Sequence, residues 1–429
     1  MNTTTQKKNY ALPIAVMFLL FFMISFVTGL QNPFGVIVKN QFNASNAMSQ
    51  LGNFANFLAY LFMGIPAGLI LQKKGYKFTA LSAVTVGFTG VALMFLSGVV
   101  GSFAVYLTGA FISGFSMCML NTVVNPLLNT LGGGGNKGNQ LIQFGGSINS
   151  IGATIVPIFV GYLIGGEVAK ASISDANPAL YIAMGIFAFA FIVLMLVKIP
   201  EPRLESQSKK ASKSDINPTT GKKYSALSFR HFVLGITAIF TYIGVEVGIP
   251  NIINLYMTEA TNLGGLGFAA GVAGTFAGSY WFLMLVGRLL GGILGGKVSS
   301  KAMLTFTSSL GIILVLSAMF IPESISFNML GEVVPLKIPF LVLCGLCTSI
   351  MWGAIFNLAT EGLGKYTELA SGIFMTMVVG GGIFPLIQGA LADSFGFLNS
   401  FWLTLVLLVF LLYYAVSGSK NVNKDIPVN

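Results

Sequence analysis

The chain has 429 residues, of which 55% are hydrophobic and only 8% are charged, and its mean hydropathy is +0.82. Soluble domains carry about 25% charged residues, so this composition excludes an ordinary soluble protein. The formal net charge of +10 is spread between apolar segments rather than gathered on one surface. This pattern argues against nucleic acid as a partner and favours a lipid bilayer.

Apolar segments long enough to cross a bilayer follow one another along the whole chain, since a spanning helix needs about 20 apolar residues. They cover residues 11–37, 47–71, 78–100, 103–130, 139–165, 179–199, 231–256, 266–295, 302–322, 338–362, 368–392 and 397–418. We therefore expect an all-α polytopic membrane protein with twelve transmembrane helices.

The basic residues between these segments predict the orientation of the chain. All but three of the 23 Lys and Arg residues fall toward one side of the predicted bilayer, Arg288 among them, and the exceptions are Lys39, Lys170 and Lys337. Because short cytoplasmic loops are enriched in Lys and Arg, we expect both termini in the cytoplasm. The chain would then be a multi-pass protein of a bacterial inner membrane.

A polar stretch at residues 200–229 divides the segments into six and six. We expect a cytoplasmic linker there, between an N-terminal six-helix bundle at residues 1–199 and a C-terminal one at residues 230–429. The halves also form pseudo-repeats, because Gly152–Gly161 has the same layout as Gly380–Gly389. Two parallel six-helix repeats are typical of major facilitator transporters, which bind substrate between the halves near the midplane.

The loop between the second and third segments resembles a signature of that superfamily, G-x-x-x-D-R-x-G-x-K/R. Here Gln72 and Lys73 replace the Asp and Arg, and a looser copy in the second half begins at Gly287. Glycines allow close helix approach, and bases meet helix C-termini at the cytoplasmic face. We expect a gating motif made of Gly68, Lys73, Gly75, Lys77 and Arg288.

One acid, Glu246, lies deep inside a predicted helix, in the run Tyr242–Gly248. Burying an ionised acid at membrane depth costs at least a few kcal/mol, so such a residue is a candidate functional group by default. We expect Glu246 to be the ion-coupling residue, with H⁺ or Na⁺ as the ion. The alternative is an acid buried only to pair with a neighbouring helix.

Other polar side chains within the segments form a candidate substrate site. Amides offer both donors and acceptors, which suits a substrate with many hydroxyls, and a tryptophan ring suits the apolar face of a sugar. The alternative is that such amides bridge helices structurally. The candidates are Gln31, Asn32, Asn121, Asn149, Tyr242, Glu246, Asn251, Trp352 and Asn357.

The runs Ser349–Phe356 and Ser371–Gly382 closely resemble the tenth and eleventh helices of the fucose permease family of sugar:proton symporters. The resemblance implies a major facilitator fold and a monosaccharide substrate. Where that family has an Asp in its first helix and a Glu in its fourth, this chain has Asn32 and Asn121, whose amides neither take up nor release a proton. The run Tyr242–Val247 is similar to a Tyr-x-Gly-x-Glu-Val pattern of glucose/galactose-type relatives, and this favours a hexose.

No cofactor, metal site or enzymatic activity is expected. Cys118, Cys344 and Cys347 all lie inside predicted helices, and neither a second cysteine pair nor a histidine cluster accompanies them. The predicted helices also contain no nucleophile–base pair.

The leading hypothesis is a hexose-type monosaccharide transporter that works by alternating access, with ion-coupled symport through Glu246. The alternatives are an uncoupled sugar facilitator and, in another class, an exporter of amphipathic compounds. We expect a monomer whose partners are a small-molecule sugar and the bilayer.

Overall fold

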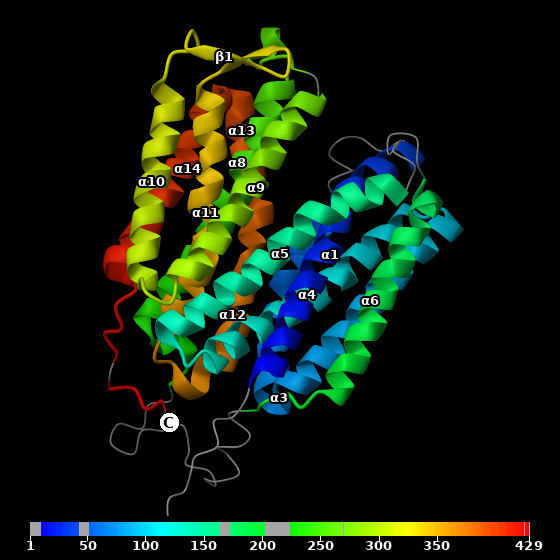
Figure 1. Ribbon diagram of the computed structural model, residues 1–429, viewed down its shortest axis with the longest axis vertical. Helices are drawn as coiled ribbons and strands as arrows, with labels where there is room; N and C mark the ends of the chain where they lie inside the picture. Colours follow the sequence, from blue (N-terminus) through cyan, green and yellow to red (C-terminus); the bar gives the residue numbers. More distant parts are fainter. Residues whose placement is uncertain are drawn as a thin grey trace, which may run out of the picture.

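The computed structural model describes residues 10–42, 51–163, 172–201, 224–268, 270–423 and 425–428. Within these ranges the chain is almost wholly helical and forms two bundles that lie side by side (Figure 1). Helices prevail because a backbone in lipid must satisfy its own N–H and C=O groups, and a helix does so within one segment. Most of the predicted linker, residues 202–223, lies outside the described residues.

In the described residues, the first bundle contains five long helices and one short 3₁₀ turn. They are α1 (Ala11–Gln41), α3 (Leu51–Val100), α4 (Phe103–Leu131), α5 (Gly135–Leu163), η2 (Ile173–Ala176) and α6 (Asn177–Leu196). The 50 residues of α3 form two helical arms joined by a kink at Gly75, whose φ of 85° only glycine adopts readily. The two arms correspond to the second and third predicted segments.

The part of the second bundle that the structure describes contains seven α-helices, several short turns and one β-hairpin. The helices are α8 (Arg230–Thr258), α9 (Ala270–Leu294), α10 (Ser300–Phe320), α11 (Lys337–Thr360), α12 (Thr367–Thr376), α13 (Gly380–Phe395) and α14 (Phe397–Tyr413). The 3₁₀ turns are η3 (Ala226–Ser228), η4 (Thr261–Leu263), η5 (Gly364–Tyr366) and η6 (Met377–Val379), and a π-helical turn, η7 (Tyr414–Gly418), continues α14. Because η6 only interrupts a longer helical run, α12 and α13 together correspond to the eleventh predicted segment.

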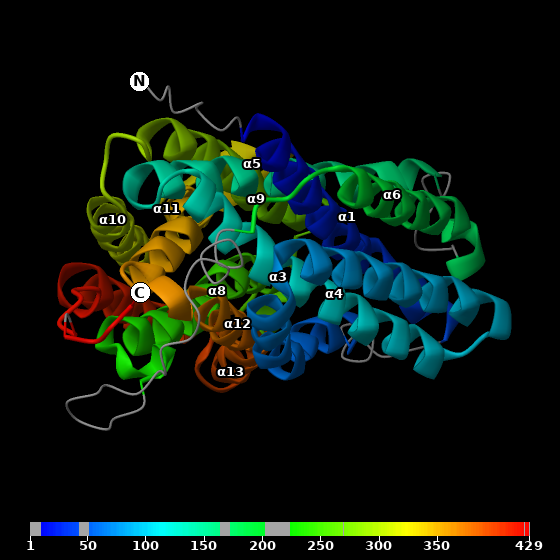
Figure 2. The ribbon, with the colours of Figure 1, turned by 90° about the horizontal axis from the view of Figure 1, so that it is seen from below.

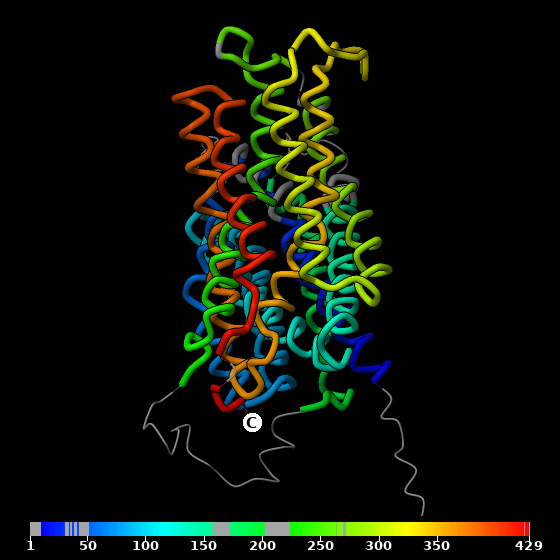
Figure 3. The backbone as a smooth tube through the Cα atoms, turned by 90° about the vertical axis from the view of Figure 1, so that its left-hand side faces the viewer, coloured from blue at the N-terminus to red at the C-terminus, as the bar shows by residue number. Residues whose placement is uncertain are grey.

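The hairpin connects α10 to α11 and was not predicted from the sequence. Strands β1 (Ser326–Met329) and β2 (Glu332–Pro335) pair antiparallel, with Ser326 opposite Pro335. Leu330 and Gly331 have φ values of 56° and 82°, which suit a tight two-residue turn. The hairpin lies at one end of the molecule, and the C-terminal residues lie at the other (Figure 3).

Ten helices in the described part of the chain are long and apolar enough to cross a membrane. That count takes the two arms of α3 together and leaves out α5, which carries Asn139, Gln140 and Gln143 among its apolar residues. The prediction of a polytopic helical membrane protein is confirmed, and each predicted segment corresponds to a helix or a helical arm.

The two bundles are joined at the end of the molecule where the C-terminal residues lie. Seen from that end, α3 of the first bundle lies against α12 of the second, and α5 lies against α9 (Figure 2). At one contact, a Cβ added to Gly372 of α12 would lie 2.6 Å from the Cα of Gly68 on α3. At the other, a Cβ on Gly292 of α9 would lie 2.6 Å from the ring of Phe144 on α5. Glycines therefore let the bundles approach closely at this end.

Candidate transport site

A cavity of about 210 Å³ lies between the two bundles and receives side chains from both. Its polar lining residues are Thr28, Tyr60, Asn121, Gln143, Asn149, Glu246, Arg288 and Ser349. Aromatic rings of Phe21, Phe57, Trp281 and Trp352 form part of the remaining wall. In the described part of the chain, Glu246 and Arg288 are the charged residues that line it.

Glu246 of α8 forms an ion pair with Arg288 of α9. One guanidinium nitrogen, Nη2, lies 3.1 Å from Oε1 of the carboxylate, and each side chain is only 10% exposed. A buried charge is costly unless it is paired and hydrogen-bonded, so each residue supplies the partner that the other requires.

The placement of Arg288 corrects the sequence-based expectation that it belongs to the cytoplasmic face. Arg288 lies six residues, roughly 9 Å, before the end of α9 at Leu294, and its side chain reaches into the cavity. A signal for this was present in the sequence. Arg288 lies inside a predicted segment, and a base at membrane depth is expected to pair with an acid.

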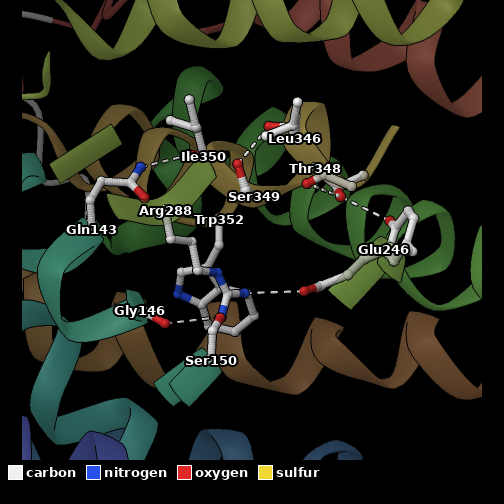
Figure 4. Close-up of polar contacts among 12 residues, drawn as sticks. Gln143, Gly146, Ser150, Glu246, Arg288, Leu346, Thr348, Ser349, Ile350 and Trp352 are labelled. Atoms are coloured by element: carbon white, nitrogen blue, oxygen red, sulfur yellow. Dashed lines mark hydrogen bonds and ion pairs between the residues drawn. The ribbon is translucent and has the colours of Figure 1, made fainter. Parts of the chain in front are cut away.

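Arg288 also bonds to the opposite bundle (Figure 4). Its other terminal nitrogen, Nη1, donates to Ser150 Oγ at 2.7 Å and to the carbonyl oxygen of Gly146 at 3.2 Å, both on α5. One guanidinium therefore joins α8, α9 and α5. The sequence analysis did not single out Ser150, because a serine inside a helix carries no signal of its own.

Two asparagines one helical turn apart on α4 connect the cavity to the second bundle. Asn121 Nδ2 donates to the hydroxyl of Tyr60 at 3.1 Å, and Asn125 Nδ2 donates to the backbone oxygen of Asn121 at 2.8 Å. Trp352 of α11 donates from Nε1 to Asn125 Oδ1 at 3.2 Å. The Trp352 ring is therefore held at the cavity wall from the other half.

Two amide side chains of α5 also line the cavity, and each donates a hydrogen bond to a backbone carbonyl. Asn149 Nδ2 donates to the carbonyl oxygen of Phe21 at 3.1 Å, and Gln143 Nε2 donates to that of Ile350 at 2.8 Å. Among the described residues, their amide oxygens accept no hydrogen bond and remain open to a ligand. Gln143 is a cavity residue that the candidate set omitted, although it belongs to the same amide-rich helix.

The remaining candidates lie elsewhere. Tyr242 is fully buried, with its ring centroid 6.4 Å from that of Trp352 and its hydroxyl interacting with Glu246, so it supports two lining residues rather than lining the cavity. Asn357 donates to Ser300 Oγ at 2.9 Å, and Asn251 is exposed on α8; neither lines the cavity. Gln31 and Asn32 belong to α1, but their side chains lie outside the described residues.

The loop motif lies at the joined end of the bundles, apart from Arg288. Gly68 packs on α12, Gly75 forms the kink in α3, and Lys73 is exposed. Lys77 Nζ donates to the carbonyl oxygens of Met195 at 2.8 Å and Val197 at 3.0 Å, at the C-terminus of α6. A base at that position stabilises the negative end of the helix dipole.

Glu201, which the sequence analysis did not select, accepts hydrogen bonds at the kink in α3. Its two carboxylate oxygens accept from the backbone N–H groups of Tyr76 and Lys77, each at 2.8 Å. A carboxylate is favoured at exposed N–H groups that begin a helix, as these do beyond the kink. The signal for it was an acid directly after the sixth predicted segment.

Comparisons with known proteins agree with this architecture. Residues 17–384 match the family model described as Major Facilitator Superfamily. The chain is 29% identical over 422 residues to a glucose/galactose transporter of Brucella abortus, covering 97% of each chain. It is 23% identical over 408 residues to the L-fucose-proton symporter of Escherichia coli, covering 91% of this chain and 89% of that one.

A solved structure shows the same fold. The fucose:proton symporter of Escherichia coli superposes with a TM-score of 0.79 at 22% identity, covering 96% of this chain and 100% of that one. The resemblance to the fucose permease family and the predicted major facilitator fold are both confirmed.

Proposed function

The chain belongs to the Major Facilitator Superfamily of multi-pass membrane transporters, and we propose that it carries a hexose-type monosaccharide by alternating access, with ion-coupled symport through Glu246. The cavity between the bundles is the substrate site in this proposal. Asn121, Gln143 and Asn149 bind sugar hydroxyls, and Trp352 packs on the ring.

The observation that carries the proposal is the lining of the cavity. Three amides, a carboxylate, a guanidinium and two indole rings converge on one small space between the two halves. Amides satisfy hydroxyls in both directions, and indole rings cover the apolar face of a pyranose. Pockets for drug-sized ligands typically measure roughly 300–1,000 Å³. A cavity of about 210 Å³ therefore suits a single sugar ring better than a larger amphipathic compound.

The relatives support the class of substrate. One is described as a glucose/galactose transporter and another as an L-fucose-proton symporter, and all of these sugars are monosaccharides. The higher identity to the first relative favours a hexose of the glucose or galactose type.

Coupling through Glu246 rests on its position at the cavity and on its partner. The carboxylate is bonded to Arg288 through a single oxygen, and a cation that binds there competes with the guanidinium. A proton or Na⁺ satisfies this chemistry, since both bind carboxylate oxygens. The same pair also favours a second candidate, the uncoupled facilitator, because a carboxylate that already has a counter-ion does not require a transported one.

The orientation of the chain forms part of the proposal. The basic loops lie at the joined end of the bundles, and the positive-inside rule makes that end cytoplasmic in a bacterial inner membrane, with both termini inside. The described state is then closed toward the cytoplasm, and the hairpin end faces outward.

Uptake by proteoliposomes tests the proposal. Labelled glucose, galactose and fucose would be offered under a proton gradient, a Na⁺ gradient, or neither. We expect accumulation of a hexose with one ion gradient, and loss of that accumulation in Glu246→Gln, while Glu323→Gln, an acid outside the membrane spans, behaves as the parent protein. Equal uptake under all three conditions would favour the facilitator, and absence of hexose uptake and binding would contradict the proposal.

A further inference from the structure

The guanidinium of Arg288 donates hydrogen bonds to both halves of the protein (Figure 4). Nη2 donates to Glu246 within its own half, whereas Nη1 donates to Ser150 and Gly146 of the other half. The bond to Ser150 Oγ, at 2.7 Å, is the shortest of the three, and Ser150 is only 5% exposed. The cross-half contact is therefore a buried, charge-assisted hydrogen bond.

The hydrogen bonds of Arg288 to the other half weaken its ion pair with Glu246. A guanidinium and a carboxylate pair most strongly when two parallel N–H···O bonds form. Here one carboxylate oxygen is bonded to Nη2, while Nη1 donates to two acceptors on α5, so the fork of Nη1 and Nη2 does not close on the carboxylate. The second oxygen of Glu246 is thus left out of the pair.

Movement of the halves changes this arrangement. Glu246 and Arg288 belong to the same bundle and move together, while Ser150 and Gly146 move with α5. When α5 separates from α9, Arg288 loses two acceptors in a buried site. A buried guanidinium with unmet donors is costly, so it then closes on the remaining acceptor, the carboxylate. The other polar contacts of α5 with α9 and α11, from Gln140 and Gln143, involve no charged partner.

We infer that Ser150 is a positioning residue that holds Arg288 toward α5 while the joined end is closed, and so keeps Arg288 from binding both oxygens of Glu246, which leaves the carboxylate able to bind the coupling cation. When the bundles separate at that end, Arg288 closes on Glu246 and displaces the cation. This inference rests on the proposed coupling at Glu246. Ser150, which does not line the cavity, thereby links the position of the two halves to the affinity of Glu246 for the ion.

Substitution of Ser150 tests the inference against a matched serine. Ser150→Ala removes the acceptor, whereas Ser147→Ala removes a buried hydroxyl of the same helix that donates only to Gln143 O of its own helix, at 3.0 Å. In proteoliposomes, with H⁺ and Na⁺ varied separately, we expect Ser150→Ala to raise the half-saturating concentration of the coupling ion roughly tenfold. Sugar counterflow at saturating ion should persist, and Ser147→Ala should match the parent protein. Ser150→Thr keeps a hydroxyl acceptor and should restore most of the ion affinity.

The outcomes separate this inference from the function on which it rests. If Glu246→Gln abolishes ion-driven accumulation but Ser150→Ala and Ser147→Ala show the same ion dependence, the role of Ser150 is refuted and the proposed function stands. If neither gradient drives accumulation in the parent protein, the coupling proposal fails and the inference fails with it. Ser150→Cys, with a much weaker acceptor, serves as the second variant if Ser150→Ala does not reconstitute.

Discussion

The two contacts between the bundles differ in chemistry although both lie at the same end of the molecule. Between α3 and α12, Gly64, Gly68 and Gly372 bring backbone against backbone. Between α5 and the second bundle, amide side chains and Arg288 reach across to specific acceptors. The first contact depends on shape and tolerates no added atoms. The second also has a glycine, Gly292, packed against Phe144, but it adds directed bonds, one of them from the charged Arg288 at the cavity. The state of this contact can therefore affect the cavity directly.

The largest expected effect comes from separating the members of the charged pair. Arg288→Met leaves Glu246 buried without its counter-ion, and breaking one partner of such a pair costs about 3–5 kcal/mol. We expect a marked fall in the melting temperature of the purified protein. The double variant Glu246→Gln/Arg288→Met removes both charges and should recover much of this loss without recovering ion-driven uptake. Equal melting temperatures for the single and double variants would show that the pair is not energetically coupled.

A side chain at the glycine contact should have the next largest effect. Gly372→Val places a Cβ 2.6 Å from the Cα of Gly68, and overpacking of this kind costs about 1–3 kcal/mol. Because the joined end can no longer close, we expect loss of net transport, measured as sugar uptake. Gly389→Ala, where an added Cβ meets nothing within 4 Å, is the control and should transport normally. Normal uptake by Gly372→Val would mean that close backbone packing is not needed here.

A smaller effect is expected where a neutral hydrogen bond crosses the halves. Trp352→Phe removes the donor to Asn125 but keeps an aromatic ring, and a neutral hydrogen bond contributes about 0.5–1.5 kcal/mol. We expect an increase of a few-fold in the KM for sugar with stability nearly unchanged. Trp402→Phe, at an exposed position on α14, should leave the KM as it is. An unchanged KM in Trp352→Phe would show that this hydrogen bond does not contribute to substrate binding.

The smallest effect belongs to a polar pair outside both contacts. Glu323 lies in the loop after α10, where hydrogen bonds from Lys337 at 2.9 Å and Tyr256 at 3.0 Å lower the pKa of its carboxyl. A lowered pKa stabilises the fold above the ordinary value for Glu, about 4.3, and the gain disappears as the pH falls through the folded-state value. Glu323→Gln should therefore lower the melting temperature slightly at neutral pH and not at all at strongly acidic pH. A difference that grows on acidification would contradict this sign.

The sequence predicted the fold well because lipid leaves the backbone few choices. Long apolar runs had to become helices, and the predicted loop between segments 47–71 and 78–100 falls where α3 kinks, at Gly75. The β-hairpin was missed because its short strands lie between two predicted segments, outside the long apolar runs on which the prediction depended.

The site was predicted less completely, and helix geometry explains two of the differences. Asn251 follows Glu246 by five residues, and Asn357 follows Trp352 by five. Five residues turn a helix by about 140° beyond a full turn, so each amide points away from the cavity that its neighbour faces. Asn121 and Asn125, four residues apart, share a face. The partnership of Arg288 with α5 required the fold, since no local pattern connects residues 138 positions apart.

The contact of Glu201 with the kink at Gly75 predicts a pattern among related sequences. This chain lacks the loop acid expected at position 72, yet a carboxylate from Glu201 serves the same turn by accepting from Tyr76 and Lys77. The two sites would then compensate for one another during divergence. Among relatives, an acid at position 72 should coincide with a neutral residue at position 201, and an acid at position 201 with a neutral residue at position 72. These two positions should therefore covary.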